Sequence, residues 1–525
     1  MHKLFSLFLL TILIGAFCVN ENVWPVPKYR VFGDITRRFD PHFKFVFPKG
    51  DCDALKYAIP KYSKIFKTAS LPEVVSKEVS PTPLTQIAIS IDSCDTTKLD
   101  IDINEAYALY ITSSSPTIAI TAETYVGALY ALETLAQLIY IDETGPFIRS
   151  VPIRIEDQPR LKWRGMMLDS ARHFLTVSKI KEMMEIMVTA RFNVFHWHLT
   201  DAQAIPLGIH AMKDVAHAAA YSTRAIYSRS DIEEIVQFGL VRGIKVMPEI
   251  DVPGHSYAWG LYDKEFVSQC PDRYAKNINN WPMNPASDKL MNMLTQVFAE
   301  FKEIFPFSHA HIGFDEPCMS CWTQSKTKSV QDFIKKTGLD GRGIYNYFLD
   351  KMSRMVTDSG LTPVGWGEIY RKTDGKAPKS MIVEAWAFND FFKEAIQKGY
   401  KVLLAHGFYL DQQVPSPSRT THYLWGDTFY DFLGVDPLNG LSKEEQKSVL
   451  GGEIPMWGEQ VNNRMIVSRV FPRAFGASAT FWSDVQEYDV TATRYVINDL
   501  SCRMNGRGHD MGPMYAGYCM YADVE

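Results

Sequence analysis

The chain has 525 residues, of which 46% are hydrophobic and 13% aromatic, so it exceeds one typical domain and can bury large cores. Lys plus Arg (55) nearly balances Asp plus Glu (60), which excludes the basic surplus of a nucleic-acid-binding protein and a polybasic membrane anchor. This balance favours a neutral substrate over a polyanionic one.

Residues 1–18 have the layout of a secretory signal peptide. His2 and Lys3 form a basic start, and residues 4–17 form an apolar stretch too short to cross a bilayer. Residues 16–18 resemble a cleavage region. No later segment approaches 18 uninterrupted apolar residues, so we expect a mature protein without an integral membrane segment. The expected destination is the secretory pathway, ending in a lysosome-like or vacuole-like compartment or outside the cell.

The cysteines after residue 18 are odd in number, so an oxidising compartment predicts disulfides and one remaining thiol. Proximity in the sequence favours three bridges: Cys52 with Cys94, Cys270 with either Cys318 or Cys321, and Cys502 with Cys519. A Cys-x-x-Cys spacing also occurs in redox and metal sites, but no second such pair accompanies Cys318 and Cys321.

Residues 19–155 predict a small α+β domain. Alternating apolar residues indicate short strands at Ile87–Ile91, Leu99–Ile103, Tyr107–Ile111 and Thr117–Ile120. The segment Ala122–Ile139 is apolar at helical spacing, so a helix should cover the sheet. The glycine and prolines of Thr144–Pro159 predict a linker.

From residue 156 to residue 525, buried strands alternate with helical stretches. Eight strands are expected, at Gly165–Asp169, Val194–Leu199, Lys245–Ile250, His309–Phe314, Pro363–Trp366, Met381–Ala385, Lys401–Ala405 and Glu453–Trp457. Amphipathic helices are expected between several of them, at Ser178–Ala190, Ser230–Gly239 and Lys289–Phe305. Eight strand–helix units predict an α/β fold: a (β/α)8 TIM barrel preceded by the small α+β domain.

Each predicted barrel strand ends in polar or aromatic side chains. In chain order they are Asp169 and Arg172; His198 and Asp201; Glu249, Asp251 and His255; Asp315 and Glu316; Trp366 and Glu368; Glu384 and Trp386; Tyr409 and Asp411; and Trp457 and Glu459. The carboxyl ends of all eight strands meet at one face of a barrel, which is where barrel enzymes carry their active sites. We therefore predict an active site built from these residues.

The adjacent carboxylates Asp315 and Glu316 end one of these strands, before a proline that cannot continue a ladder. Two neighbouring acids in a buried place repel each other, so we expect the pKa of one of them to rise. A carboxylic acid kept protonated near neutral pH can act as a general acid. Acids also favour helix N-termini, which is the alternative interpretation of the pair.

Tryptophans among carboxylates and an arginine are typical of a sugar-binding site. Indole faces stack on the apolar faces of a pyranose, while Asp, Glu and Arg bond its hydroxyls. Any one of Trp366, Trp386 and Trp457 could instead fill a core, because tryptophan is highly buried on average. Three at successive strand ends favour the site.

Two other classes of protein compete with this interpretation. A metal-dependent hydrolase would use imidazoles inside a barrel, and His196 with His198, or His309 with His311, have the i, i+2 spacing for it. That scheme leaves the tryptophans and the acid pair without a role. A carbohydrate-binding protein that lacks catalysis would not need the acid pair.

The stretch HIGFDEP at 311–317 resembles the signature of glycoside hydrolase family 20, the β-N-acetylhexosaminidases. Other stretches resemble this family in the same order: RGMMLDSARHFL (164–175), FHWHLTDAQ (195–203), PEIDVPGH (248–255), GWGE (365–368), EAW (384–386), YLD (409–411) and GGEIPMWGE (451–459). The resemblance covers nearly the whole chain, and the family also has an α+β domain before its barrel.

The resemblance implies a retaining exo-glycosidase that removes terminal β-linked N-acetylglucosamine or N-acetylgalactosamine from an oligosaccharide or glycoconjugate. The 2-acetamido oxygen of the substrate would be the nucleophile. Glu316 would be the general acid and then the general base, and Asp315 would orient the acetamido group. No metal or organic cofactor is implied, and a homodimer is expected.

The same resemblance implies roles for other positions. Trp366, Trp386 and Trp457 would wall the acetamido group, and Tyr409 would donate a hydrogen bond to its oxygen. Substrate hydroxyls would be bonded by Arg172, Asp411 and Glu459. Asp201 and His255 would form a pair behind the acid that helps to set its pKa.

Two further expectations follow from the resemblance. Cys270–Cys321 and Cys502–Cys519 match family disulfides, which leaves Cys318 as the odd thiol. Gln412 stands where relatives that accept anionic substrates have a basic residue, so neutral terminal sugars should be preferred.

Overall fold

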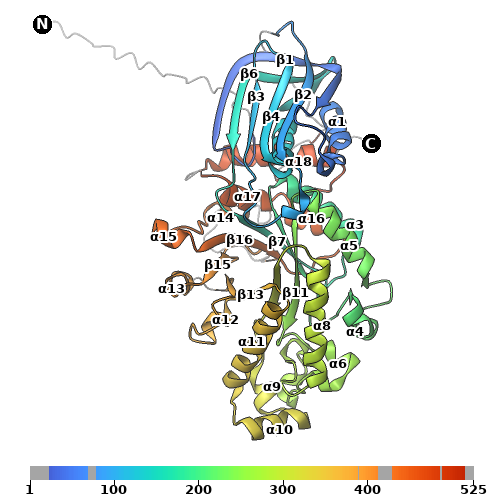
Figure 1. Ribbon diagram of the computed structural model, residues 1–525, viewed down its shortest axis with the longest axis vertical. Coiled ribbons are helices and arrows are strands. Elements are labelled where there is room, and N and C mark those ends of the chain that lie inside the picture. The colour runs from blue at the N-terminus through green and yellow to red at the C-terminus, as the bar shows by residue number, and fades with distance from the viewer. Residues whose placement is uncertain are drawn as a thin grey trace, which may run out of the picture.

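A computed structural model describes residues 23–68, 79–387, 390–411, 428–484 and 488–514, together with Cys519. A six-stranded sheet is followed along the chain by a closed eight-stranded barrel (Figure 1). The helices α17 (Ala474–Trp482) and α18 (Val490–Gly506) lie between them, so the end of the chain packs on both parts. The predicted signal peptide and Gln412 lie outside the described residues.

The N-terminal part is a mixed sheet with two helices. Its strands are β1 (Tyr29–Val46), β2 (Leu84–Ser93), β3 (Tyr107–Ile111), β4 (Thr117–Thr124), β5 (Ile139–Asp142) and β6 (Gly145–Asp157), in the order β1-β2-β4-β3-β6-β5 with a further β1–β6 pairing. Helix α1 spans Ala58–Thr68 and α2 spans Tyr125–Leu138. The Thr124 hydroxyl caps α2, which is buried along its whole length because it contacts the sheet and the barrel helix α3 (Val177–Thr189).

Three expectations for this part were incomplete or wrong. The strand predicted at Leu99–Ile103 is a turn that follows a short 3₁₀ helix, Thr96–Lys98, which begins where the Asp95 side chain accepts from Thr97 N. The linker predicted at Thr144–Pro159 is β6, where Val151, Ile153 and Ile155 alternate inward between outward Pro152 and Arg154. Strand β1 had not been predicted. The prolines of β6 suggested a linker, and the role of Asp95 as a helix cap was not recognised. Local residue types were insufficient here because pairing with other strands decides whether a segment is a strand.

The barrel prediction is confirmed. Eight parallel strands close in the order β11-β12-β13-β14-β15-β16-β7-β8. They are β7 (Trp163–Asp169), β8 (Val194–His198), β11 (Lys245–Val252), β12 (His309–Gly313), β13 (Thr362–Trp366), β14 (Ile382–Ala385), β15 (Lys401–Leu404) and β16 (Val449–Met456). The boundary placed between residues 155 and 156 stays a prediction.

Helices of several lengths surround the barrel. The longer ones are α3 (Val177–Thr189), α5 (Arg229–Leu240), α8 (Asp288–Ile304), α10 (Lys328–Thr337) and α11 (Gly341–Asp358). The shorter elements are β9 (Leu207–Gly208), α4 (Lys213–Ala219), β10 (Tyr227–Ser228), α6 (Trp259–Tyr262), α7 (Asp272–Ala275), α9 (Met319–Thr323), α12 (Glu368–Arg371), α13 (Phe392–Gln397), α14 (Thr428–Leu433), α15 (Lys443–Gln446) and α16 (Ile466–Val470). Within the described residues, no helix combines the length and apolarity needed to cross a membrane.

Strand register sets which side chains meet inside the barrel. Glu249 on β11 lies opposite His198 on β8 and His311 on β12, and His198 lies opposite Asp169 on β7. Because the strands are parallel, residues at one level are neighbours around the barrel. Titratable groups from four strands are therefore brought together.

A buried carboxylate joins the N-terminal part to the amino ends of the barrel strands. Glu105, just before β3, lies 2.7 Å from Arg164 Nη2 on β7 and accepts a 3.0 Å hydrogen bond from Asn193 Nδ2. Its Oε1 also lies 4.0 Å from Lys245 Nζ on β11. Two buried cations thus share one carboxylate, so the two parts stabilise each other.

Glu105→Gln tests this junction. The variant leaves the Arg164 and Lys245 cations buried without their carboxylate, so we expect a loss of about 3–5 kcal/mol in the free energy of unfolding. Urea unfolding of the whole chain measures it. Glu123→Gln, at an exposed position in the same part, should change this free energy by less than about 0.5 kcal/mol. Equal effects of the two substitutions would contradict the assignment.

Candidate active site

The carboxyl ends of the barrel strands bring most of the predicted residues together. Arg172, Asp201, His255, Asp315 and Glu316 form one contact set at the ends of β7, β8, β11 and β12. An aromatic set from β13 to β16 contains Trp366, Trp386, Tyr409 and Trp457. Asp411 lies close enough to Glu459 and Arg172 for both charges to act on its pKa.

A left-handed turn after β12 sets the orientation of the acid pair. Gly313, Phe314 and Glu316 have φ values of 64°, 73° and 42°. A Cβ on Gly313 would stand 2.0 Å from Asp251 Oδ1, so only glycine fits there. Positive φ at Phe314 and Glu316 costs about 1–3 kcal/mol each, and such strain clusters at functional sites. The turn leaves Asp315 only 8% exposed, while the Glu316 side chain is 60% exposed.

His255 stands behind the acid pair. Its Nε2 lies 3.8 Å from both Asp315 Oδ2 and Glu316 Oε2, and its Nδ1 lies 3.2 Å from Asp201 Oδ1. One imidazole therefore links a buried carboxylate on one side to the pair on the other.

Arg172 is the cationic hub of the site. Its guanidinium bonds Asp169 at 3.0 Å and Asp201 at 2.8 Å, and reaches Glu459 at 3.8 Å. The guanidinium carbon also lies 4.9 Å from the centre of the Trp457 ring. Burial alone would lower the pKa of Arg172, but the surrounding carboxylates raise it, so the side chain stays charged.

The aromatic set forms the other side of the site. The ring centres of Trp366 and Trp457 are 5.9 Å apart, and those of Trp386 and Tyr409 are 6.0 Å apart. Trp386 is held by its Nε1, which donates a 2.8 Å hydrogen bond to Glu368 Oε2. Trp366 Nε1 is buried and donates to no residue that the structure describes.

The pKa of Glu316 is lowered, which corrects the expectation of a raised value for use as an acid. Its hydrogen bond to His255 lowers the pKa more than partial burial raises it. The raised values occur at neighbouring acids instead. Burial and the charge of Asp315 raise the pKa of Glu368 to about 7, and burial raises that of Asp411 to about 6. Burial and Asp315 also raise the pKa of Asp251. The pKa of Glu316 is lowered rather than raised because its side chain lies beside His255 and is largely exposed.

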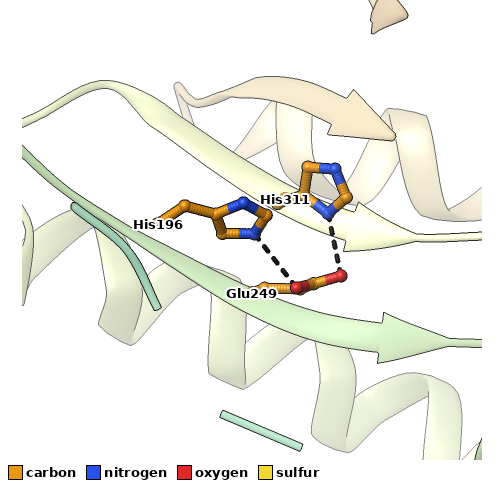
Figure 2. Close-up of side chains that lie close together, drawn as sticks. All are labelled: His196, Glu249 and His311. Atoms are coloured by element: carbon orange, nitrogen blue, oxygen red, sulfur yellow. Dashed lines mark hydrogen bonds and ion pairs between the residues drawn. The ribbon is translucent and has the colours of Figure 1, made fainter. Parts of the chain in front are cut away.

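The histidines on the strands gather in the barrel interior. Figure 2 shows His196 and His311 facing the same carboxylate, Glu249. The distances are 3.0 Å from His196 Nε2 and 2.9 Å from His311 Nδ1. The spacing would also suit a metal ion. These nitrogens already face carboxylate oxygens at hydrogen-bond distance, so the group is explained as a buried hydrogen-bonded network, and the absence of a metal cofactor stays a prediction.

Several groups at the site had no individual chemical role assigned in the sequence analysis. Glu249, Asp251 and Glu368 were recognised only as strand-end acids, and their positions were the available signal. Gln203 accepts from Arg172 Nε at 3.2 Å, and Lys372 acts on the pKa of Glu316. Gln203 ends the stretch 195–203 that resembles the family, but its contact with Arg172 has no signal in the residue types. Lys372 had no sequence signal, because it follows helix α12 and reaches the site only through the fold.

The structure contains the disulfides Cys52–Cys94 and Cys270–Cys321. The first joins elements of the N-terminal part, and the second joins the loops after β11 and β12. Cys318, a partly exposed thiol, precedes α9. The pairing of Cys502 with Cys519 stays a prediction.

Comparison with known proteins gives consistent matches. The profile of glycosyl hydrolase family 20, catalytic domain, matches residues 161–485, and a profile described as beta-acetyl hexosaminidase like matches residues 23–138. The chain is 31% identical to beta-hexosaminidase subunit A1 of Dictyostelium discoideum, over 99% of this chain and 94% of the relative. It is 31% identical to human beta-hexosaminidase subunit beta, over 84% and 78%. The chitobiase structure of Flavobacterium johnsoniae superposes with a TM-score of 0.78 at 28% identity, covering 93% of this chain and 73% of that one.

Glu368→Gln tests the electrostatics of the aromatic side. The pKa of Glu368 in the folded protein, about 7, lies above the ordinary value of 4.5, so ionising it opposes folding. Below pH 4.5 Glu368 is protonated in both the folded and the unfolded protein, so its ionisation costs no stability. The cost grows between pH 4.5 and pH 7 and is constant above pH 7. Glutamine avoids it.

We therefore expect the variant to gain up to about 3 kcal/mol relative to wild type between pH 4 and pH 8, at about 1.4 kcal/mol per pH unit. Urea unfolding of both proteins at the two pH values measures this gain. A difference in stability that does not change with pH would contradict the raised pKa.

Proposed function

The chain belongs to glycosyl hydrolase family 20 and is a glycoside hydrolase of N-acetylhexosamine, and from this premise we propose a retaining, substrate-assisted exo-mechanism. In it, terminal non-reducing β-linked N-acetylglucosamine or N-acetylgalactosamine is removed. The 2-acetamido oxygen of the substrate attacks the anomeric carbon, so no protein carboxylate has to be the nucleophile.

The buried, unsatisfied oxygen of Asp315 is the observation that carries this proposal. Asp315 Oδ1 accepts no hydrogen bond from any described residue, although its neighbour Glu316 is largely exposed. A buried acceptor without a donor costs free energy, which a substrate N–H would recover. Asp315 therefore accepts from the acetamido N–H, orients the group and stabilises its developing positive charge.

Glu316 is the general acid and base in the proposal. Its exposed side chain can reach the glycosidic oxygen, protonate it as the bond breaks, and then take a proton from the water that opens the intermediate. Asp201 and His255 act behind it: the contact from His255 influences its pKa, and Asp201 holds the imidazole.

The aromatic set encloses the acetamido group in this mechanism. Trp366, Trp386 and Trp457 exclude water and pack on the methyl group and the sugar face, while Tyr409 donates to the acetamido oxygen. The hydrogen bond from Trp386 to Glu368 supports this role because it fixes one indole in place.

Outer hydroxyls are bonded by the charged side of the site. Arg172, Asp411 and Glu459 take this role, and Asp411 Oδ1 is buried without a donor among the described residues. We also propose a preference for neutral terminal sugars, because Gln412 stands where relatives that accept anionic substrates have a basic residue.

We also propose passage through the secretory pathway to a lysosome-like or vacuole-like compartment or to the outside, and assembly as a homodimer. The disulfides Cys52–Cys94 and Cys270–Cys321 support the first, because disulfides persist in oxidising compartments. Light scattering of the purified chain would measure the oligomeric state.

Hydrolysis of three aryl β-glycosides tests the mechanism: those of N-acetylglucosamine, N-acetylgalactosamine and glucose. Wild type should cleave both N-acetyl sugars and leave the glucoside uncut, with no effect of EDTA. Glu316→Gln should lose about 10²–10⁴-fold in kcat, and Asp315→Asn about 10²-fold or more, because each removes a group used in the transition state.

Other outcomes would replace the proposal by a specific alternative. Equal cleavage of the glucoside would mean that the acetamido group is not the nucleophile. Activity abolished by EDTA would support metal catalysis through the barrel histidines. Binding of N-acetylglucosamine without cleavage of any glycoside would indicate a carbohydrate-binding protein.

A further inference from the structure

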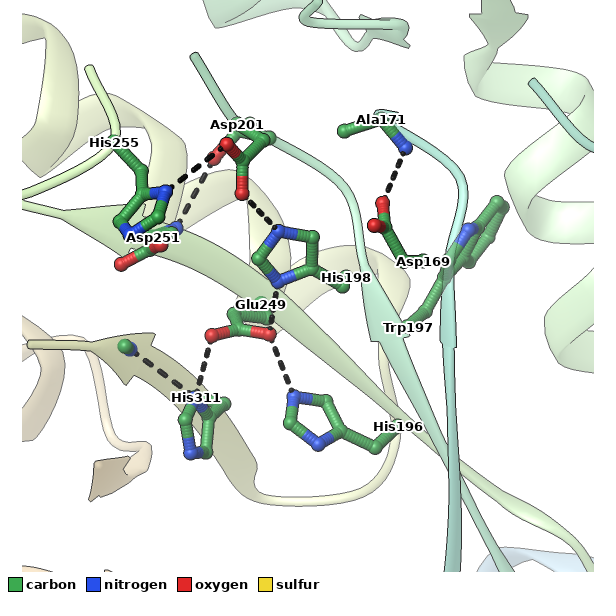
Figure 3. Close-up of polar contacts among 12 residues, drawn as sticks. Asp169, Ala171, His196, Trp197, His198, Asp201, Glu249, Asp251, His255 and His311 are labelled. Carbon is green, nitrogen blue, oxygen red and sulfur yellow. Dashed lines mark hydrogen bonds and ion pairs between the residues drawn. The ribbon is translucent and has the colours of Figure 1, made fainter. Parts of the chain in front are cut away.

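Alternating carboxylates and imidazoles run from the barrel interior to Glu316. The members in order are Glu453, His196, Glu249, His198, Asp201, His255 and Glu316, with facing atoms 2.8, 3.0, 2.5, 2.9, 3.2 and 3.8 Å apart. We call these seven residues the carboxylate–imidazole chain. Figure 3 shows its middle part, from His196 to His255. Every member except Glu316 is at most 6% exposed.

Strand register creates this chain. His196 and His198 point inward from β8, and Glu249 lies opposite His198 on β11. Glu249 therefore sits between the two imidazoles and also faces His311 of β12. Asp201 follows β8 and receives His198 Nε2 on one oxygen and His255 Nδ1 on the other. The chain is continuous because Glu249 Oε2 faces both His196 and His198, Asp201 meets His198 and His255 with different oxygens, and each imidazole uses both of its nitrogens.

Both ring nitrogens of His196 and of His198 face carboxylate oxygens, which favours the cationic form of each imidazole. Burial would lower the pKa of each, but neighbouring carboxylates outweigh it, raising His196 to about 10 and His198 well above its ordinary value. Burial would raise the pKa of Glu249, but the charges of His198 and its neighbours lower it. His198 can then donate to Glu249 and to Asp201 at once, which a neutral imidazole cannot do.

Five groups face His255. They are Arg172 after β7, Asp201 after β8, Asp251 on β11, and Asp315 and Glu316 after β12. Burial would lower the pKa of His255, but Asp201 and the acid pair raise it well above its ordinary value. Its Nε2 proton therefore points toward the pair in the free protein.

We propose that Glu249 and His198 are positioning residues for proton delivery: they fix and partly neutralise Asp201, so that His255 can pass its Nε2 proton to Glu316 when substrate binds. This inference deepens the proposed function, because it rests on Glu316 as the general acid. Asp201 is the point of control. The cations of His198 and Arg172 both contact Asp201 Oδ2, whereas His255 Nδ1 contacts Oδ1, so these cations reduce the negative charge that Asp201 presents to His255.

The transfer is balanced within the site. The Nε2–H bond of His255 breaks and its electron pair stays on nitrogen, while an O–H bond forms at Glu316 Oε2. His255 becomes neutral and keeps the Nδ1–H that it donates to Asp201. Bound substrate removes water from Glu316, which disfavours its charge and drives the transfer. The 3.8 Å contact shortens as the exposed Glu316 side chain moves, as catalytic contacts do on binding.

Glu249→Gln tests the proposal, since it removes the charge and keeps the shape. His198 then loses its proton and becomes neutral. Asp201 keeps more of its negative charge, so the cationic form of His255 becomes more stable and its Nε2 proton is harder to remove. The loss of the His198 cation outweighs the loss of the Glu249 anion, because His198 contacts Asp201 directly and Glu249 lies one residue further along the chain of contacts. With an aryl N-acetyl-β-glucosaminide we expect kcat to fall about tenfold, with KM within about twofold. The alkaline limb of kcat/KM against pH should move up by about one pH unit.

Two variants are matched controls. Glu384 is also buried in the barrel, 3.7 Å from His311 Nε2, and burial raises its pKa, so Glu384→Gln replaces a neutral acid by a neutral amide and should leave the limb unmoved. Glu249→Asp keeps the charge and should restore the wild-type limb. Urea unfolding checks that Glu249→Gln is folded. If it is not, His198→Gln replaces it as the test, because this variant removes the same cation and keeps a donor to Asp201.

The direction of the shift decides between roles. A loss of kcat that is equal at every pH, with an unmoved limb, would reduce Glu249 to structural support and overturn the proposal. A limb that moves down would mean that His255 senses the Glu249 anion more than the His198 cation, which also overturns it. A wild type that does not prefer N-acetyl sugars would defeat the proposed function instead, so the two failures are distinguishable.

Discussion

A charge buried inside the barrel must have an opposite charge and hydrogen bonds within reach, and this constraint organises the rest of the structure. Glu249 satisfies it through three imidazoles. His198 of β8 and His311 of β12 lie opposite it in the strand register, and His196 reaches it from two residues earlier on β8. An uncompensated ion in this interior would cost several kcal/mol. The strands can therefore close in this register only if the acids and imidazoles alternate.

The two ends of the barrel use buried charge differently. At the amino ends, Glu105 of the N-terminal part neutralises Arg164 and Lys245, and the sheet covers the junction. At the carboxyl ends, the line of charges runs outward and stops at the exposed side chain of Glu316. One end stabilises because its charges are enclosed. The other end suits the proposed catalysis because its last carboxylate is exposed and is held in a strained turn.

The family assignment is consistent with this difference between the two ends of the barrel. A glycoside hydrolase needs an acid whose protonation state changes during the reaction, and such an acid cannot be locked in a fully satisfied ion pair. Glu316 faces His255 across 3.8 Å, whereas the deeper members of the carboxylate–imidazole chain lie between 2.5 and 3.2 Å apart. The shorter contacts of the network are in the core, and its longest contact is at Glu316, the general acid of the proposed mechanism.

Much of the barrel was predictable because its eight strands are buried on both faces and appear as short apolar runs with polar ends. The N-terminal part was less predictable. Strand β1 and β6 depend on pairing between residues more than a hundred positions apart, and Leu99–Ile103 has a strand-like alternation without a strand partner. The orientation of Asp315 and Glu316 was also not predicted, since the residue types at Phe314 and Glu316 do not indicate a left-handed turn.

The sequence by itself determined the fold class, and it predicted both the face of the barrel for the site and the acid pair Asp315 and Glu316, because strand periodicity and strand-end chemistry are local properties. Only the tertiary structure decided the protonation of these groups. The pKa of Glu316 falls because His255 from another strand stands beside it, while that of Glu368 rises to about 7 through burial and the nearby Asp315. A pKa depends on charges and water within a few ångströms, and those neighbours are assembled from distant parts of the chain.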